Sequence, residues 1–157
     1  RSPSSRELAV EEVLAEVKEM VETRLVREGR EGIEVKTRCP AGIKAWGDRD
    51  MFVQILSNLA INGVQAIREG HTGRVQIEAG ADGEQIRFRI RDNGIGMAPD
   101  LLKKVGEAFF TTRQGGGGLG GAISRHLTTI LGGTFRIQSL EGRGTVVEVA
   151  FPQRDNR

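Results

Sequence analysis

The stretch RVQIEAGADGEQIRFRIRD, from Arg74 to Asp92, decides the fold class. Apolar and polar residues alternate on both sides of its turn at 81–84 (ADGE), which is typical of two strands joined in a hairpin. TFRIQSL and GTVVEVAF, at 134–140 and 144–151, alternate in the same way around a Glu-Gly-Arg turn. Two hairpins predict a sheet that is largely antiparallel.

Working outward from the first hairpin, the remaining apolar residues recur with the spacing of helices. Ser5 is expected to cap the first helix and Asp48 the second, because both side chains can accept a hydrogen bond from a free helical N–H. Gly132 and Gly133 are a strong stop signal for the last helix. The sequence predicts helices over 6–27, from 49 to 67 or 69, and 119–131, a short helix after Pro99, and a further strand over 33–38.

The order is helix, strand, helix, two strands, an irregular stretch, helix and two strands. It predicts an α/β (α+β) two-layer sandwich, in which a mixed, largely antiparallel sheet of about five strands is covered on one face by about three helices. The 157 residues suit one domain. We expect residues 1–5 to be a linker end, 6–152 the domain and 153–157 a tail.

Composition excludes several classes of protein. Charged residues make up 28% of the chain but the net charge is only +2, and without a basic block nothing favours nucleic acid as a partner. The single cysteine, Cys39, excludes an internal disulfide framework and leaves no zinc spacing, so a reducing, cytoplasmic setting is the expectation. There is no apolar run near ~18 residues, so we expect no membrane span and no direct membrane contact.

Four amide side chains share a narrow arc of the second helix, beside its core-facing side: Gln54, Asn58, Asn62 and Gln65. Asn is a poor residue in the middle of a helix, so such an arc is unusual. Two interpretations stay open on these residues alone. The arc is either a polar stripe facing solvent, or the lining of a cleft whose amide oxygens could ligate Mg²⁺.

Glycine marks two more candidate sites. In RDNGIGM, Asp92 ends a strand, and Gly94 and Gly96 let the backbone turn sharply beside a flat ligand. A simple turn is the alternative interpretation. In RQGGGGLGGAIS (113–124), glycines precede a helix N-terminus, where free N–H groups and the helix dipole favour an anion. A linker is a poor alternative there, since too little chain follows to fold alone.

Taken in order, these segments resemble the ATP-binding catalytic domain of sensor histidine kinases, in the GHKL ATPase/kinase superfamily. QILSNLAINGVQA resembles the N-box, DNGIGM the first glycine box, EAFFTTR (107–113) the phenylalanine box, GGGGLGGAI the second glycine box, and EGRGTVVEVAFP the closing strands. The FFTT sequence is similar to kinases of the nitrogen-regulation type. The resemblance covers about 5–152.

The resemblance implies the ligands ATP and Mg²⁺ and a role for each matching residue. Asn62 would ligate Mg²⁺, with Asn58 near the phosphates, and Asp92 would bind the adenine amine with help through water from Thr145. Residues 98–118 would form a mobile lid, anchored by Phe109 and Phe110. Arg113 would lie near the γ-phosphate, and the catalytic residues would be Asn58, Asn62 and Arg113. The remaining ATP contacts would be Gln65, Gly94, Ile95, Gly96, Met97, Gly116, Gly117, Gly118 and Leu119.

Asn58 separates kinases from hydrolases within the superfamily. The hydrolysing branch carries a glutamate at this position as general base, and an amide cannot take a proton. The resemblance therefore implies phosphoryl transfer to a histidine. His71 and His126 lack the context of the acceptor histidine, so we expect it on a dimerisation domain upstream of Arg1. A response regulator would receive the phosphoryl group, and the isolated domain would be monomeric within a homodimeric full-length protein, whose membrane anchoring stays open.

Two residues depart from the family pattern. Gly117 stands where relatives carry Thr, and Gly121 where they carry Leu. Loss of one hydroxyl contact, worth about 0.5–1.5 kcal/mol net, and loss of a core side chain predict weak ATP binding or a disordered lid. A nucleotide-binding pseudokinase or regulatory module is therefore one alternative function. A serine kinase of the anti-sigma type is another, which the helix at 6–27 and the FFTT sequence disfavour.

Overall fold

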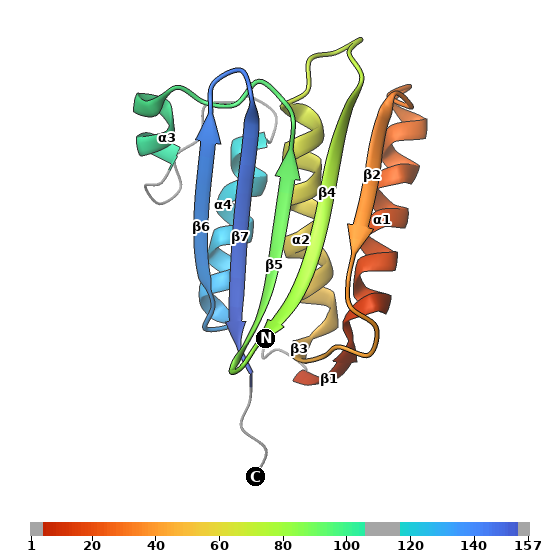
Figure 1. Ribbon diagram of the computed structural model, residues 1–157, viewed down its shortest axis with the longest axis vertical. Helices are drawn as coiled ribbons and strands as arrows, with labels where there is room; N and C mark the ends of the chain where they lie inside the picture. Colours follow the sequence, from red (N-terminus) through yellow and green to blue (C-terminus); the bar gives the residue numbers. More distant parts are fainter. Residues whose placement is uncertain (1–4, 106–116, 154–157) are drawn as a thin grey trace.

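The computed structural model describes residues 5–105 and 117–153. Its helices and strands form two layers, with the long helices together on one face of a sheet whose other face is uncovered (Figure 1). The predicted two-layer sandwich is therefore confirmed. The elements are β1 (Ser5–Ala9), α1 (Val10–Arg27), β2 (Ile33–Arg38), β3 (Lys44–Asp48), α2 (Arg49–Gln65), β4 (Gly73–Asp82), β5 (Gln85–Asp92), α3 (Pro99–Val105), α4 (Gly117–Ile130), β6 (Thr134–Leu140) and β7 (Gly144–Pro152).

The main sheet of the described chain has five strands in the order β2-β4-β5-β7-β6. Only the β2–β4 pair is parallel; β4–β5, β5–β7 and β6–β7 are antiparallel, as the two hairpins predicted. The register sets Asp92, the last residue of β5, opposite Thr145 of β7. Two residues singled out from distant segments of the sequence are thus neighbours at one end of the sheet.

The helix-covered face of the sheet holds the core. Phe52 of α2, Phe88 of β5 and Phe151 of β7 are each at most 2% exposed, and their ring centroids lie 5.0–6.2 Å apart in tilted and edge-on arrangements. The Oγ of Ser124 in α4 donates to the carbonyl of Ile55 at 3.3 Å, which ties α4 to α2. Among the described residues, no helix has the length and apolar composition needed to cross a membrane.

The N-terminal prediction was wrong in one respect. Residues from Ser5 to Ala9 form a strand, and α1 begins at Val10 with Ala9 as its N-cap residue, so Ser5 caps nothing. Glu7, Leu8 and Ala9 are all tolerated in helices, but here this segment pairs antiparallel with β3, a strand that the sequence analysis did not predict. A non-local pairing has overridden local propensity.

The second helix begins as predicted and fixes the position of the site. Asp48 accepts a hydrogen bond from the backbone N–H of Met51 at 3.0 Å, as an N-cap residue should. The helix ends at Gln65, with Ala66 as its C-cap residue, slightly before the predicted end. α3 follows Pro99 as expected, and α4 begins at Gly117, two residues before the predicted Leu119.

A candidate nucleotide site at the end of the sheet

Asp92 lies where strand β5 meets helix α2. Its side chain is on the helix side of the sheet and the residue is 7% exposed. One carboxylate oxygen, Oδ1, accepts the backbone N–H of Gly94 at 2.9 Å. A Cβ on the buried Gly63 would lie 3.2 Å from Asp92 Cβ and 3.4 Å from the other oxygen, Oδ2, so glycine at this position lets α2 pack closely against Asp92.

The loop after β5 is held against the C-terminal end of α2. The backbone N–H of Ile95 donates to the carbonyl of Ala66 at 2.9 Å. A Cβ on Gly94 would overlap that same carbonyl group. Only glycine permits so close an approach of two backbones, which explains the first glycine of the DNGIGM segment by geometry.

The same loop is fixed on its other side by the β6–β7 hairpin. Gly96 has φ of 68°, and a Cβ there would overlap the carbonyl oxygen of Leu140. The N–H of Gly142 donates to the carbonyl of Ile95 at 2.6 Å, and the N–H of Met97 donates to Ser139 Oγ at 2.9 Å. The loop is therefore a rigid wall between α2 and the sheet.

Thr145 lies opposite Asp92 on the neighbouring strand, and Ser139 lies opposite Thr145 one strand further on. Ser139 Oγ donates to the carbonyl of Gly144 at 3.0 Å and lies 2.8 Å from Thr145 Oγ1. The hydroxyl group of Ser139 has a single proton, which it donates to the carbonyl of Gly144. Thr145 Oγ1 is therefore the donor in its hydrogen bond with Ser139 Oγ. The lone pairs of Thr145 Oγ1 then remain available to a water or a ligand. Ser139 was missed from the sequence, because a serine in an alternating strand gives no signal.

The four amides of α2 divide into two pairs. Asn58 and Asn62 are half-buried, whereas Gln54 and Gln65 are exposed. Asn62 immediately precedes Gly63, whose backbone approaches Asp92. This distribution favours the cleft-lining interpretation for Asn58 and Asn62 over a uniform solvent-facing stripe.

Part of the predicted site lies outside the described residues. Phe109, Phe110, Arg113 and Gly116 are among these. The backbone of Gly117, Gly118 and Leu119 forms the first turn of α4. The glycine-rich segment thus leads into a helix N-terminus, the arrangement in which backbone N–H groups can face an anion.

The described residues restrict what the site could bind. A buried carboxylate and a nearby hydroxyl group can recognise the polar edge of a flat ring. No group of three or more His, Cys, Asp or Glu side chains in the described ranges could hold a metal ion.

Comparison with known protein families agrees with this geometry. The profile of the family described as histidine kinase-, DNA gyrase B-, and HSP90-like ATPase matches residues 47–155. This range contains α2, Asp92, the glycine loop and Thr145. The chain belongs to this family.

Named relatives narrow the class to sensor kinases. The chain is 36% identical over 106 residues to the sensor protein DegM of Bacillus sp. (strain B21-2), covering 68% of this chain and 28% of that protein. It is 31% identical over 158 residues to the sensor-like histidine kinase SenX3 of Mycobacterium tuberculosis (strain ATCC 25618 / H37Rv), covering 97% of this chain and 37% of the relative. The chain thus spans about a third of the length of these relatives.

Solved structures show the same fold. The catalytic domain of histidine kinase ThkA, at 24% identity and a TM-score of 0.81, covers 96% of both chains. Full-length ShkA in complex with AMPPNP, at 29% identity and a TM-score of 0.81, covers the whole of this chain and 33% of its own. The predicted resemblance to the ATP-binding catalytic domain of sensor histidine kinases is confirmed.

Proposed function

We propose that this chain is the ATP-binding catalytic domain of a two-component sensor histidine kinase, which transfers the γ-phosphate of Mg-ATP to a histidine of a separate dimerisation domain. The observation that carries the proposal is the buried carboxylate of Asp92 between Gly63, Gly94 and Thr145. Membership of the ATPase family and sensor kinases as relatives support it.

Asp92 would select adenine. The carboxylate is an acceptor without a donor of its own, so it suits the exocyclic amine of adenine and opposes a carbonyl oxygen. Gly63 lets α2 approach Asp92 closely, and the lone pairs of Thr145 Oγ1 suit a bridging water. Gly94, Ile95, Gly96 and Met97 would form the rigid wall of the base pocket.

Asn62 would hold Mg²⁺ through its amide oxygen, with Asn58 one turn earlier near the phosphates. Bound Mg²⁺ would supply charge neutralisation for the transferring phosphoryl group. Because Asn58 is an amide, it cannot deprotonate a water, which favours transfer over hydrolysis. Gln65, Arg113 and Gly116 to Leu119 would complete the contacts to the phosphates, and residues 98–118 would form the lid.

The partners follow from the reaction. The phosphoryl acceptor would be the dimerisation domain of the same protein, and the next recipient the receiver domain of a response regulator. The domain itself would be a monomer in the cytoplasm, joined within a homodimeric protein. Sensor kinases among the relatives support this arrangement.

A transfer assay tests the proposal. The domain is mixed with its histidine-bearing dimerisation domain and γ-labelled Mg-ATP, and we expect acid-labile, base-stable label on the acceptor. Asn62→Ala should abolish labelling. Gln54→Ala is the matched control, since Gln54 is an exposed amide on the same arc about 12 Å along the helix, at 1.5 Å per residue. Labelling that survives in Asn62→Ala would contradict the assignment of the metal ligand.

Gly117 and Gly121 favour one second candidate, a nucleotide-binding pseudokinase or regulatory module. These glycines replace a hydroxyl and an apolar side chain in the phosphate-binding segment. Tight nucleotide binding together with no label on the acceptor would identify this alternative. Restoring Gly117→Thr and Gly121→Leu should then recover transfer if the glycines are the cause.

A further inference from the structure

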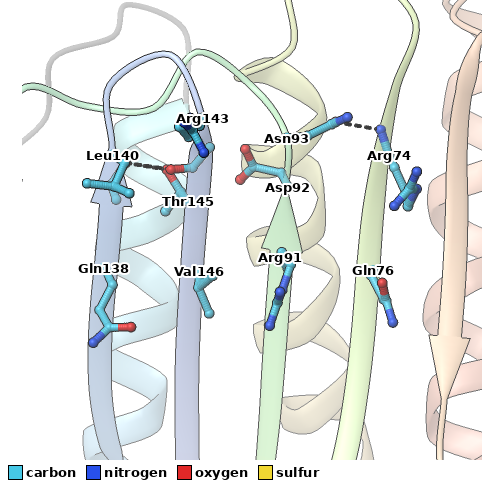
Figure 2. Close-up of a pocket in the computed structure, with 12 residues that line it drawn as sticks. Arg74, Gln76, Arg91, Asp92, Asn93, Gln138, Leu140, Arg143, Thr145 and Val146 are labelled. Carbon is cyan, nitrogen blue, oxygen red and sulfur yellow. Dashed lines mark hydrogen bonds between the residues drawn. The ribbon is translucent and has the colours of Figure 1, made fainter.

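The uncovered face of the sheet carries a hollow that borders the proposed nucleotide site. It has a volume of about 330 Å³ and lies at the same end of the sheet as Asp92, but on the side away from the helices (Figure 2). Side chains from four strands and the β6–β7 turn surround it. Its lining includes Arg74, Arg91, Asn93, Gln138, Arg143 and Val146, and it also includes Asp92, Ser139 and Thr145 of the proposed nucleotide site.

Gly144 creates the hollow. Strand register sets Gly144 opposite Leu140, and Asn93 follows Asp92 on the other side, so the row of side chains across the sheet has a gap at this position. Gly144 has φ of 128°, and a Cβ there would overlap the carbonyl oxygen of Asp92. The gap is therefore required by the backbone and is not an accident of a small side chain.

The rim of the hollow is cationic. Arg91 and Arg143 are exposed, and within the described part of the chain neither forms an ion pair with an acidic side chain. The positive charge of Arg74 is partly compensated by Glu34, because Arg74 Nε lies 3.5 Å from Glu34 Oε1. Figure 2 shows Arg143 above the gap and Arg91 below it. The three guanidinium groups stand against two carboxylates, those of Glu34 and of Asp92, which also borders the hollow, so the local charge is near one positive unit.

Other arginines on the same face of the sheet do form ion pairs with an acidic side chain. Arg87 and Arg89, the preceding open-face residues of β5, both reach Glu148 of β7, at 3.0 and 3.4 Å. In the next row the residue of β7 is Val146, which offers Arg91 no carboxylate. Arg136 of β6 likewise forms no ion pair with an acidic side chain among the described residues, but Arg91 and Arg143 differ from it in lining the hollow.

Neutral donors complete the lining. Arg74 N–H donates to Asn93 Oδ1 at 2.7 Å, which fixes that amide and leaves its NH₂ group to donate elsewhere (Figure 2). Gln138 lines the opposite side on β6. Carboxylate and phosphate oxygens match the fork of a guanidinium group, so this donor set suits an anion with several oxygens.

We propose that this hollow is a second ligand site, which binds a small anion carrying two or more carboxylate or phosphate oxygens with a charge of at least two. Its volume lies at the lower end of the range for small-molecule pockets. Val146 and the exposed Leu140 give it an apolar side, which suits a short carbon skeleton between acidic groups. The hollow borders Asp92 and Thr145 of the nucleotide site. Strand alternation points these two side chains to the helices and Arg91 and Val146 away from them, so the anion would contact a different set of side chains.

Amide chemical-shift titration of the ¹⁵N-labelled domain tests the site at constant ionic strength. The probes are succinate, inorganic phosphate and, as a monoanion control, acetate. We expect saturable shifts at Gly144, Asn93 and Val146 with succinate or phosphate and none with acetate. Saturation by succinate alone would assign a dicarboxylate ligand, and by phosphate alone a phosphorylated one.

Two matched variants make the test specific. Arg91→Ala with Arg143→Ala should weaken binding at least about tenfold, because two charge-assisted hydrogen-bond donors are lost. Arg136→Ala is the control, since Arg136 is an exposed open-face residue of β6 that does not line the hollow, and it should bind as the parent does. All these side chains are exposed, so the fold should persist. Absence of saturable shifts with both probes, or equal weakening in both variants, would overturn the proposal.

Discussion

The two faces of the central sheet carry different kinds of side chain on the same strands. In β5 the residues Ile86, Phe88 and Ile90 are at most 2% exposed beneath the helices, while Arg87, Arg89 and Arg91 alternate with them on the uncovered face. Burial of apolar surface stabilises the domain on one side, and ion pairs across strands keep the other side soluble.

The difference teaches where function can arise in this fold. In the middle of the sheet, the covered face holds apolar side chains that pack in the core. The open face there holds ion pairs such as those of Arg87 and Arg89 with Glu148. The pattern breaks only at the end of the sheet, where Asp92 takes a helix-facing position that an apolar residue holds elsewhere in β5. On the opposite face the break is Gly144, which leaves a gap. Both candidate sites therefore lie at one end of the sheet.

The largest effect should come from the covered face. Phe88→Ala removes a ring packed between Phe52 and Phe151, with centroids at 5.8 and 6.2 Å, and should lower the free energy of unfolding by about 3–5 kcal/mol. Urea denaturation followed by circular dichroism measures this. Arg89→Ala, its neighbour on the open face, is the matched control and should cost less than about 1 kcal/mol. Equal losses in both variants would contradict the division of roles between the faces.

A smaller effect is expected where the glycine loop meets the hairpin. Gly96→Ala places a side chain against the carbonyl of Leu140 at a φ of 68°, and should cost about 1–3 kcal/mol of stability. Gly42→Ala has a similar φ of 81° but nothing within 4 Å of the added Cβ, so it reports the backbone strain alone. The Gly96 variant should be the less stable of the two in thermal denaturation. The reverse order would show that the loop is not held as described.

The smallest effect should be on the open face. Glu148→Gln removes the shared partner of Arg87 and Arg89 and should cost about 0.5–1 kcal/mol, because these groups are partly exposed and screened by water. The cost should shrink in about 1 M salt, where the Debye length is near 3 Å. Urea denaturation at low and high salt measures it. A loss that is independent of salt would mean that packing, not charge, is the contribution of Glu148.

Much of the fold could be predicted from the sequence because its signals are local. Alternation gave the hairpins, and Asp48 marked the start of α2 by its capping chemistry. The β1–β3 pair could not be found in this way, because its pairing joins segments far apart in the chain. Gly47 in β3 is meaningful only in three dimensions, where a Cβ would overlap the ring of Phe52.

The candidate site was predictable to a similar degree. Asp92, Gly94 and Gly96 stood out as a motif, and their contacts explain the residue types. Ser139 was missed, since its role depends on Met97 and Thr145 lying nearby across strands. The cationic hollow was also missed. It depends on strand register, which no local pattern of the sequence reveals.

The most direct test of the account is calorimetric titration of ADP and Mg²⁺ into the domain and its Asp92→Asn variant. The amide keeps the size of the side chain but offers a donor toward the adenine amine, so affinity should fall at least about tenfold. Asp82→Asn, at the other end of the same hairpin, should bind as the parent does. We also expect weak binding of Mg-ATP by the parent, because of Gly117 and Gly121, and a low-micromolar affinity would contradict that part. Equal ADP affinity in the parent and Asp92→Asn would contradict the assignment of the nucleotide site itself.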